Sequence, residues 1–368
     1  MMTASNGPVR QSSVRAHNLA LVLQTVANRA DQPSRAAIAT LTGLTRATVS
    51  ALVDDLIAGG LLVERDPLPR TGAGRPAAGL ALSPDGPAGL GLEINVDYLA
   101  ACVVDLAGTV RHRAVRPTSP PVALSDLASL AGEVAAAASA DGLTLAGAAL
   151  AVPGLVTPGG IVRVAPNLGW QDVDVPALLA GAPGLAGLSI SVDNEANLAA
   201  LGELRAGGSA PTFLYVSGEI GIGAGIVLDG VLYRGGRGWS GEIGHVTVYP
   251  DGRPCRCGAN GCLEQYAGQS QVADDPELAA SALGIALSAV VNLLDIGVVV
   301  LGGAYAPVFD QLRDGIEAEL RRRVLTAGLS PVELRPAVLG ADAAIRGAAD
   351  TVVREVRENP AAWLSRAV

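Results

Sequence analysis

The chain has 368 residues, of which 49% are hydrophobic and 17% charged, and its 26 basic and 35 acidic residues give a formal net charge of −9. This length favours two or three domains, and the apolar fraction excludes an intrinsically disordered protein. No window of about 18 apolar residues is free of charge, glycine or proline, and residues 1–15 lack the apolar core of a secretory signal. We therefore expect a folded, cytoplasmic protein with no membrane partner.

The charge is distributed unevenly along the chain. Residues 1–82 carry eight arginines and five acids, whereas residues 83–368 carry eighteen arginines and thirty acids. Because an acidic body repels nucleic acid, any contact with DNA should be made by the N-terminal part. Because a chance fluctuation of three charges would give the same imbalance, the charge distribution alone does not establish DNA binding. That has to be judged from the sequence motifs of the N-terminal part.

The first forty residues predict two helices. Apolar residues at a helical spacing indicate an amphipathic helix over residues 16–28. These residues are Leu19, Val22, Leu23 and Val26. Ser34 suits the N-cap of a short second helix that extends through Thr40, and residues 42–44 are typical of a tight turn at a glycine.

A third helix is predicted to start at Thr45, with its apolar residues on one face. That face consists of Val49, Leu52, Val53 and Leu56. In a helix-turn-helix, the N-terminal residues of the second helix of the pair reach base edges in the major groove. The candidate DNA-binding residues of the two helices are Arg35, Thr45, Arg46, Ala47, Thr48 and Ser50.

Two short strands are predicted at 61–63 and 80–82, on either side of a loop over 65–76 that is rich in proline, glycine and arginine. The loop tip at 72–76 contains Arg75, which is suited to enter a minor groove or to contact phosphate. Three helices followed by such a hairpin predict a winged helix-turn-helix DNA-binding domain over residues 1–82. A three-helix packing module with no role in DNA binding is the alternative.

Three of the four cysteines lie close to a histidine, in the pattern His245-x9-Cys255-x-Cys257-x4-Cys262. Four nitrogen and sulfur ligands at this spacing favour a closed tetrahedral Zn²⁺ site. A surface loop with reduced thiols is the alternative. Cys102 lies in an apolar run and is interpreted as a buried strand residue.

Polar side chains follow several apolar runs of the chain. Gly154 comes after a predicted strand at 145–152, Asn167 lies in the next loop, and residues 193–197 connect a predicted strand at 188–192 to a predicted helix at 198–204. Because a carbohydrate presents many hydroxyl groups at fixed angles, its site needs several convergent Asn, Asp, Glu or His side chains. Taken singly, each of these residues is equally explained as a helix cap or a loop residue.

Two parts of the chain resemble the ROK family, whose name joins repressors, open reading frames and sugar kinases. Residues 34–50 with Gly74-Arg75-Pro76 resemble its DNA-binding part, and residues 241–264 resemble its signature segment. The resemblance implies an α/β protein in which an N-terminal winged helix-turn-helix precedes a two-lobed, actin-like ATPase domain of the ribonuclease H-like type. We expect lobe 1 over 83–205 with 341–368, and lobe 2 with the zinc loop over 206–340.

The same resemblance implies a structural Zn²⁺ whose ligand His245 also faces a sugar, so that the metal orients a group that recognises the effector. The candidate metal ligands are His245, Cys255, Cys257 and Cys262. The candidate sugar-binding residues are Gly154, Asn167, Asn194, Glu195, Glu242, His245 and Glu264.

The phosphate-binding loops of ROK sugar kinases are altered in this chain. Where the kinases have Asp-x-Gly-Gly-Thr, residues 93–97 read Glu-Ile-Asn-Val-Asp, and the Gly-Thr of their second loop corresponds to Glu219-Ile220. Bulk and negative charge at these positions oppose triphosphate binding. The kinase catalytic Asp corresponds to Glu195, whereas Gly302-Gly303 keeps a glycine pair that a strand-to-helix turn explains equally well.

These features predict a sugar-responsive transcriptional repressor without enzyme activity. We expect it to bind a partly palindromic operator DNA as a homodimer or homotetramer and to respond to a sugar or sugar phosphate. The first alternative is an active ROK sugar kinase that carries a DNA-binding module. The second is a regulator that responds to a protein partner.

Overall fold

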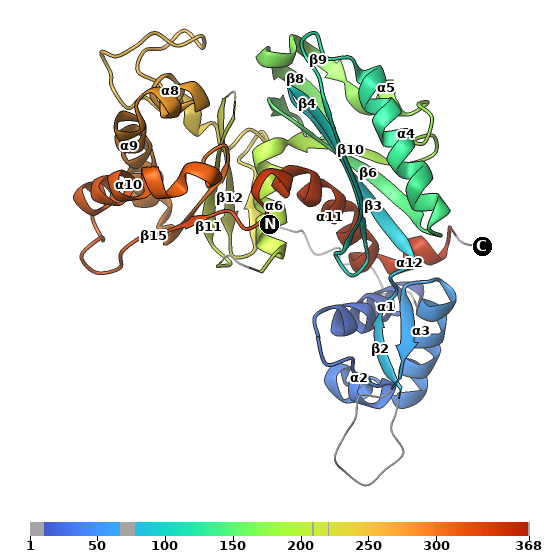
Figure 1. Ribbon diagram of the computed structural model, residues 1–368. Coiled ribbons are helices and arrows are strands. Elements are labelled where there is room, and N and C mark those ends of the chain that lie inside the picture. The colour runs from blue at the N-terminus through green and yellow to red at the C-terminus, as the bar shows by residue number, and fades with distance from the viewer. Residues whose placement is uncertain (1–10, 67–77, 208–209, 220, 367–368) are drawn as a thin grey trace.

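The computed structural model describes residues 11–66, 78–207, 210–219 and 221–366 (Figure 1). Its elements form an N-terminal module followed by two five-stranded sheets with helices on both faces. The predicted loop tip at 72–76 with Arg75 lies outside the described residues, as does Ile220.

The N-terminal module contains three helices and an antiparallel pair of strands. They are α1 (Gln11–Ala27), α2 (Arg35–Thr42), α3 (Arg46–Ala58), β1 (Leu62–Arg65) and β2 (Gly79–Leu82). The four apolar residues predicted for each of the helices α1 and α3 are all buried. Ser34 caps α2 as predicted, whereas Thr45 precedes α3 as its N-cap and is not its first residue.

Lobe 1 is built on a sheet with the strand order β10-β6-β3-β4-β5. Its strands are β3 (Pro87–Ile94), β4 (Tyr98–Asp105), β5 (Val110–Pro117), β6 (Thr144–Val152) and β10 (Ile190–Asn194). The central strand β3 is antiparallel to β4 and parallel to β6. Sequence analysis did not identify β5, because three arginines and a histidine interrupt its apolar residues and all of its residues are half-buried or exposed.

Lobe 2 repeats this plan with the strand order β13-β12-β11-β14-β15. Its strands are β11 (Phe213–Gly218), β12 (Ile222–Leu228), β13 (Val231–Tyr233), β14 (Val298–Gly303) and β15 (Glu333–Pro336). Here β11 is antiparallel to β12 and parallel to β14, as β3 is to β4 and β6. In each sheet, neighbouring strands among the first three in chain order are therefore antiparallel, and the last two strands are parallel to the central strand.

The helices lie in layers on both sides of the sheets (Figure 1). Helix α4 covers one face of the lobe 1 sheet and α11 the other, α6 lies between α11 and the lobe 2 strands, and α9 with α10 covers the outer face of lobe 2. Their bounds are α4 (Leu124–Ala140), α6 (Glu195–Arg205), α9 (Pro276–Leu294), α10 (Phe309–Arg323) and α11 (Ala343–Glu358).

The short run Gly89-Leu90-Gly91-Leu92 explains how β3 accepts a helix on each face. The leucines point into a fully buried apolar cluster with α4. On the other face, a Cβ atom at Gly91 would lie 2.0 Å from the carbonyl oxygen of Ile345. Only glycine allows α11 to approach the strand this closely.

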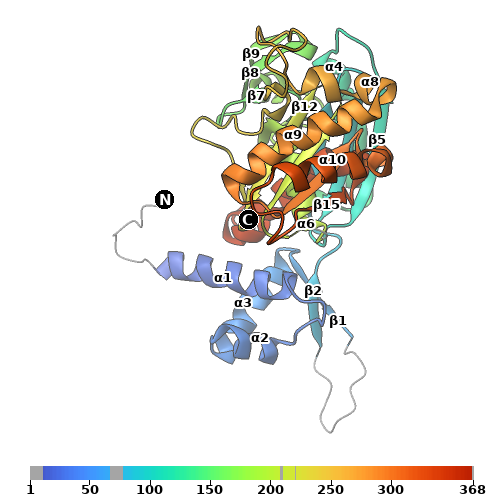
Figure 2. The ribbon, with the colours of Figure 1, turned by 90° about the vertical axis from the view of Figure 1, so that its left-hand side faces the viewer.

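Smaller elements complete the lobes. A three-stranded sheet in lobe 1 consists of β7 (Leu155–Val156), β8 (Ile161–Ala165) and β9 (Trp170–Asp174). The short helices are α5 (Val175–Leu179), α7 (Glu264–Ala267), α8 (Gln269–Asp274) and α12 (Pro360–Leu364). Figure 2 shows the N-terminal module below the two lobes, with β2 leading upward into the lobe 1 sheet.

Helix α9 is, taken singly, the one described helix long and apolar enough to cross a membrane. Half of its apolar window is buried inside the protein, where it packs against α7, α8 and α10. These contacts are typical of a core helix of a folded domain. The domain boundaries predicted at 82, 205 and 340 stay a prediction, although α11 packs against the lobe 1 sheet.

Candidate functional site

The start of α3 presents a row of small and basic residues to solvent. Thr45, Arg46 and Ala47 are exposed, whereas Thr48 and Ser50 are half-buried. The Thr45 hydroxyl accepts a hydrogen bond from the backbone N–H of Thr48 at 3.2 Å, and this caps the helix. The cap leaves Arg46 exposed, with no ion pair to another described residue.

Arg35, also predicted to contact DNA, is held inside the N-terminal module. Its guanidinium group forms ion pairs with Asp54 at 2.6 Å and Glu64 at 2.9 Å. It also donates a hydrogen bond to the carbonyl oxygen of Ser50 at 3.2 Å. These contacts connect α2, α3 and β1, so a DNA contact by Arg35 would require it to leave two carboxylates.

The predicted metal ligands converge on one point. The ligand atoms of His245, Cys255, Cys257 and Cys262 all lie within 4.8 Å of one another. The Sγ atoms of Cys257 and Cys262 are 3.6 Å apart, and Cys255 Sγ lies 3.8 Å from His245 Nδ1. Tetrahedral Zn²⁺ with bonds of about 2.3 Å to sulfur needs ligand separations of about 3.8 Å. The cluster therefore fits a zinc ion.

Backbone contacts shape the loop that carries these ligands. The N–H of Cys255 donates to the carbonyl oxygen of Ala259 at 2.8 Å, which closes a turn around Cys257. Gly261 has a φ of +70°, and a Cβ atom there would lie 1.6 Å from the carbonyl oxygen of Tyr249. Glycine is thus required immediately before the buried ligand Cys262.

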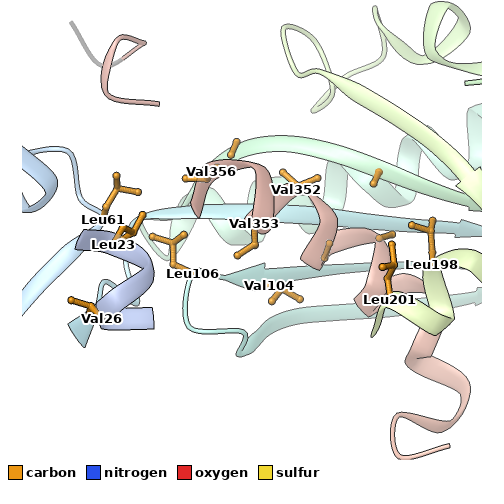
Figure 3. Close-up of a cluster of buried hydrophobic side chains, with 14 of the residues drawn as sticks. Leu23, Val26, Leu61, Val104, Leu106, Leu198, Leu201, Val352, Val353 and Val356 are labelled. Carbon is orange, nitrogen blue, oxygen red and sulfur yellow. The ribbon is translucent and has the colours of Figure 1, made fainter. Parts of the chain in front are cut away.

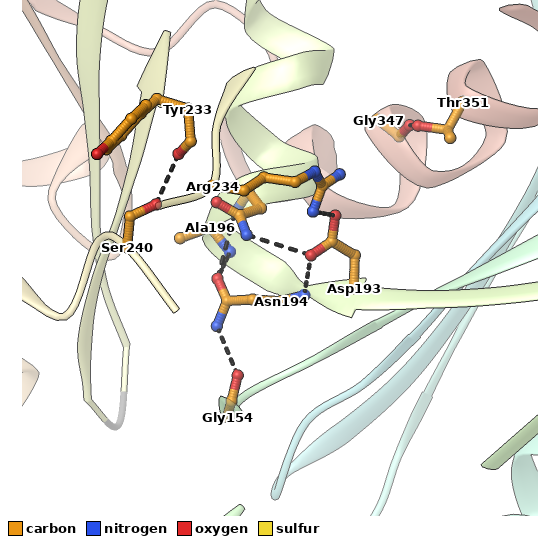
Figure 4. A network of polar contacts seen from close by, with 10 residues as sticks. Gly154, Asp193, Asn194, Ala196, Tyr233, Arg234, Ser240, Gly347 and Thr351 are labelled. Carbon is orange, nitrogen blue, oxygen red and sulfur yellow. Dashed lines mark hydrogen bonds and ion pairs between the residues drawn. The ribbon is translucent and has the colours of Figure 1, made fainter. Parts of the chain in front are cut away.

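Asn194 and Gly154 meet at the start of α6 (Figure 4). The Asn194 side chain caps α6 by accepting from the N–H of Ala196 at 2.9 Å, and it donates to the carbonyl oxygen of Gly154 at 3.1 Å. It also donates to Glu195 Oε2 at 2.8 Å. These contacts hold Asn194 and Gly154 together where β6 ends and α6 begins. Helix α6 begins three residues earlier than predicted.

The chain also brings together a pair of residues that sequence analysis did not single out. Arg234, just beyond β13 of lobe 2, forms an ion pair with Asp193 of lobe 1 at 2.6 Å (Figure 4). Asp193 also accepts from the Asn197 side chain at 3.1 Å. Both Asp193 and Arg234 line a cavity of about 280 Å³ that also includes Thr351. The pair connects the two lobes beside Asn194.

Four of the predicted sugar-binding side chains form an electrostatically coupled group. Burial raises the pKa of Glu195 well above its usual range, and the nearby carboxylate of Glu242 raises it further. Burial likewise raises the pKa of Glu242, which the neighbouring His245 lowers and Glu264 raises. The group therefore offers several hydrogen-bond acceptors and little positive charge.

Asn167 is the predicted sugar-binding residue for which the structure gives the least support. It lies in a single 3₁₀ turn, Pro166–Leu168, just after β8. Ala165, two residues earlier, packs against Gly154. A hollow of about 1260 Å³ lies between α4 and residues 178–188, and none of the predicted site residues lines it.

The two turns that correspond to the kinase phosphate loops face each other across the lobes. The Asn95 side chain, after β3, donates to Glu219 Oε2, after β11, at 2.8 Å. Burial raises the pKa of Glu219, and the negative charge of Asp97 raises it further. Glu93 is buried nearby, and its Oε2 atom has no hydrogen-bond partner among the described residues.

Comparison with known proteins identifies relatives of two kinds. A model of the ROK family matches residues 89–276. The chain is 34% identical to the xylose repressor of Caldicellulosiruptor bescii over 259 residues, which cover 68% of this chain and 64% of that protein. It is 27% identical to the xylose repressor of Bacillus spizizenii over 352 residues, or 87% of this chain and 91% of that protein.

Solved structures agree with the fold. A ROK family transcriptional regulator described as a homologue of the E. coli Mlc protein superposes with a TM-score of 0.79 at 22% identity, covering 96% of this chain and 99% of that chain. A ROK hexokinase from Thermus thermophilus gives a TM-score of 0.62 at 32% identity, covering 74% and 99%. The predicted fold class, a helix-turn-helix before a two-lobed actin-like α/β domain, is confirmed.

We expect the free energy of unfolding to fall as pH rises, and Glu93→Gln to reduce this fall. Burial raises the Glu93 pKa from 4.5 to about 8. The Glu93 carboxyl therefore ionises at a higher pH in the folded protein than in the unfolded chain. Its contribution to the free energy of unfolding is fully present below its ordinary pKa of 4.5 and is lost as the pH rises through about 8. The loss between about pH 6 and about pH 9 should be on the order of 2–3 kcal/mol.

Urea denaturation at several pH values measures this difference. Glu277→Gln, which changes an exposed carboxylate on α9, is the matched control and should keep the wild-type pH profile. Equal pH profiles for wild type and Glu93→Gln would contradict the burial of an ionisable carboxyl at this position.

Proposed function

Because the chain belongs to the ROK family, we propose that it is a sugar-responsive transcriptional repressor that acts in the cytoplasm. The observation that carries this proposal is that two separate candidate sites occur in the same chain. An exposed helix start at Arg46 lies in the N-terminal module, and polar side chains gather at the start of α6 between the lobes. The relatives named xylose repressors support the same combination.

The sugar is proposed to bind beside the start of α6. Carboxylates and amides there offer acceptors and donors to hydroxyl groups, as a polyhydroxylated ligand requires. The contacts are assigned to Gly154, Asn167, Asn194, Glu195, Glu242, His245 and Glu264. Glu195 and Glu264 approach the same strand, because Cβ atoms at Gly223 and Gly221 would lie 3.4 Å and 3.0 Å from their carboxylate oxygens.

The Cys and His cluster is proposed to hold a structural Zn²⁺. Its separations fit the tetrahedral geometry, and backbone hydrogen bonds and two isolated bridges hold the loop that carries three of the four ligands. With Nδ1 of His245 directed toward Cys255, the Nε2 atom of the ring is left for a sugar hydroxyl. The metal would then fix the orientation of a sugar-binding group.

An active sugar kinase is the second candidate, because a related hexokinase shares the fold. The two acidic turns after β3 and β11 argue against an active kinase. Burial and the negative charge of Asp97 raise the pKa of Glu219. Acidic groups at both turns would oppose the phosphates of ATP, for which kinases use backbone N–H groups and cations. We therefore propose that the sugar cleft is retained and that catalysis is not.

On the DNA side, we propose that paired winged helices of a homodimer or homotetramer bind a partly palindromic operator. Thr45, Arg46, Ala47, Thr48 and Ser50 would face the major groove, and Arg75 would contact the minor groove or phosphate. Arg35 would contact DNA only if its ion pairs with Asp54 and Glu64 break in the DNA-bound state.

Calorimetry against a panel of neutral sugars and sugar phosphates tests the proposed function. At least one ligand should bind, and Glu264→Gln should weaken it about 10- to 100-fold, because a hydrogen bond to a charged acceptor is lost. Glu277→Gln is the control for a general effect of lost charge. Sugar-dependent ADP release from ATP would favour the kinase, and no binding of any sugar would favour a protein partner as the signal.

Arg46→Ala should weaken operator binding about 10- to 100-fold without a change in sugar affinity, because it removes an exposed cation at the start of the proposed recognition helix. The operator can be selected from a randomised duplex library and the affinity measured in a salt titration. Arg321→Ala, on the exposed surface of α10, is the control. Unchanged operator affinity at every salt concentration would contradict the assignment of α3.

Cys262→Ser should abolish binding of one zinc ion per chain, because Cys262 is a buried member of the cluster. Loss of the metal should lower the melting temperature by about 10 °C, as expected for a few kcal/mol in a domain of this size. Metal content and thermal unfolding are measured together. Cys102→Ser, far from the cluster, should keep its zinc, and zinc-free wild-type protein of unchanged stability would contradict the proposal.

A further inference from the structure

The C-terminal helix α12 is docked on the N-terminal module. The indole N–H of Trp363 donates to the carbonyl oxygen of Gly59, the residue that ends α3, at 3.0 Å. A Cβ atom at Gly59 would lie 2.0 Å from Leu364 Cδ2, so the leucine fills the space that glycine leaves. Arg366 donates to the carbonyl oxygen of Ala146 on β6 at 3.2 Å. This helix therefore contacts α3 and lobe 1 together.

A second connection joins the same two parts through the chain itself. Only residues 83–86 separate β2 from β3. A Cβ atom at Gly86 would lie 2.0 Å from the carbonyl oxygen of Gly60, so this linker is pressed against the end of α3. A module held at one point could rotate about it, whereas contacts by the linker and by α12 on neighbouring residues fix its orientation.

Buried side chains continue from this junction into the lobes (Figure 3). Leu23 and Leu61 of the N-terminal module, Val353 and Val356 of α11, and Leu198 of α6 belong to one apolar cluster. Figure 3 shows the α11 valines in the middle of the row, between the module and α6. Close-packed interiors of this kind transmit displacement with little compression.

Helices α6 and α11 are packed at the distance of direct backbone contact. A Cβ atom at Gly347 would lie 1.8 Å from the carbonyl oxygen of Leu198. On its other side α6 lies against β12 of lobe 2, where a Cβ atom at Gly225 would be 2.6 Å from the carbonyl oxygen of Ala196. A shift of lobe 2 on α6 therefore has to move α11 as well.

We propose that α6, α11 and α12 form one rigid relay, and that Trp363 is the positioning residue through which the relay sets the orientation of α3. The inference rests on the proposed function, because α6 begins at the proposed sugar site and α3 is the proposed recognition helix. Sugar alters the contacts of α6 with lobe 2, and the docked α12 carries the resulting movement to the end of α3. Only a ligand that favours one arrangement of the lobes shifts this equilibrium.

The experiment measures operator affinity with and without the sugar for wild type, Trp363→Ala, Trp363→Phe and Ser365→Ala. The sugar should change the operator affinity of wild type about 5- to 150-fold. In Trp363→Ala this factor should fall to within about twofold of one, while the calorimetric affinity for sugar stays within about twofold of wild type. Trp363→Phe keeps the packing and loses the N–H donor, so it should restore part of the response. Ser365 is exposed immediately after the same helix, and its variant should behave as wild type.

Gly59→Leu tests the same contact from the DNA-binding side. Gly59 has a φ of −83°, so a side chain there causes no backbone strain and acts by displacing Leu364 and α12. It should reduce the response to sugar as Trp363→Ala does, with sugar affinity unchanged. Agreement of two variants on opposite sides of one contact excludes an effect that belongs to either residue alone.

Hydrogen exchange of the amides of residues 59–61 gives a reading that does not depend on sugar. Docking predicts faster exchange there in Trp363→Ala than in wild type or Ser365→Ala. Unchanged exchange, or a full sugar response in both Trp363→Ala and Gly59→Leu, overturns the relay. Loss of sugar binding in Trp363→Ala also overturns it, because the effect would then lie in the fold of the lobes. A wild-type protein that binds no sugar contradicts the proposed function instead.

Discussion

The close contact of α6 with both lobes is the constraint on which the rest of the structure depends. Its backbone touches β12 at Gly225 on one side and α11 at Gly347 on the other. Any larger residue at either glycine would separate the layers. Because Asn194 and Glu195 stand at the first turn of this helix, the proposed sugar site lies where the positions of both lobes are determined.

The buried acidic groups support the proposal that this cleft does not perform phosphoryl transfer. Burial raises the pKa of Glu93, Glu195 and Glu219, and the negative charge of Glu219 raises the pKa of the other two further. The nearby cation Arg234 is already engaged in an ion pair with Asp193. Hydroxyl groups can donate to such acceptors, whereas a triphosphate would add further negative charge. The hydrogen bond between Asn95 and Glu219 also occupies the space between the two turns.

The sequence alone predicted the features that depend on residues close together in the chain. The buried apolar faces of α1 and α3, the Ser34 cap and the clustering of one histidine with three cysteines agree with the predictions, because each depends on residues a few positions apart. Contacts between distant segments were not predicted. Arg35 appeared free for DNA until the fold brought Glu64 to it, and neither the Asp193–Arg234 pair nor the docking of Trp363 on Gly59 leaves a periodic signal.

The docking of α12 has a consequence for how the N-terminal module is attached to the lobes. A hexokinase of the same family aligns over 74% of this chain and nearly all of its own length. The linker at residues 83–86 provides one covalent attachment between the N-terminal module and lobe 1. The indole of Trp363 supplies a second, noncovalent anchorage from a residue 304 positions after Gly59. An N-terminal module fused to lobes of this kind by its linker alone would lack the second of these tethers, so a complementary surface on α12 is needed as well as a covalent junction.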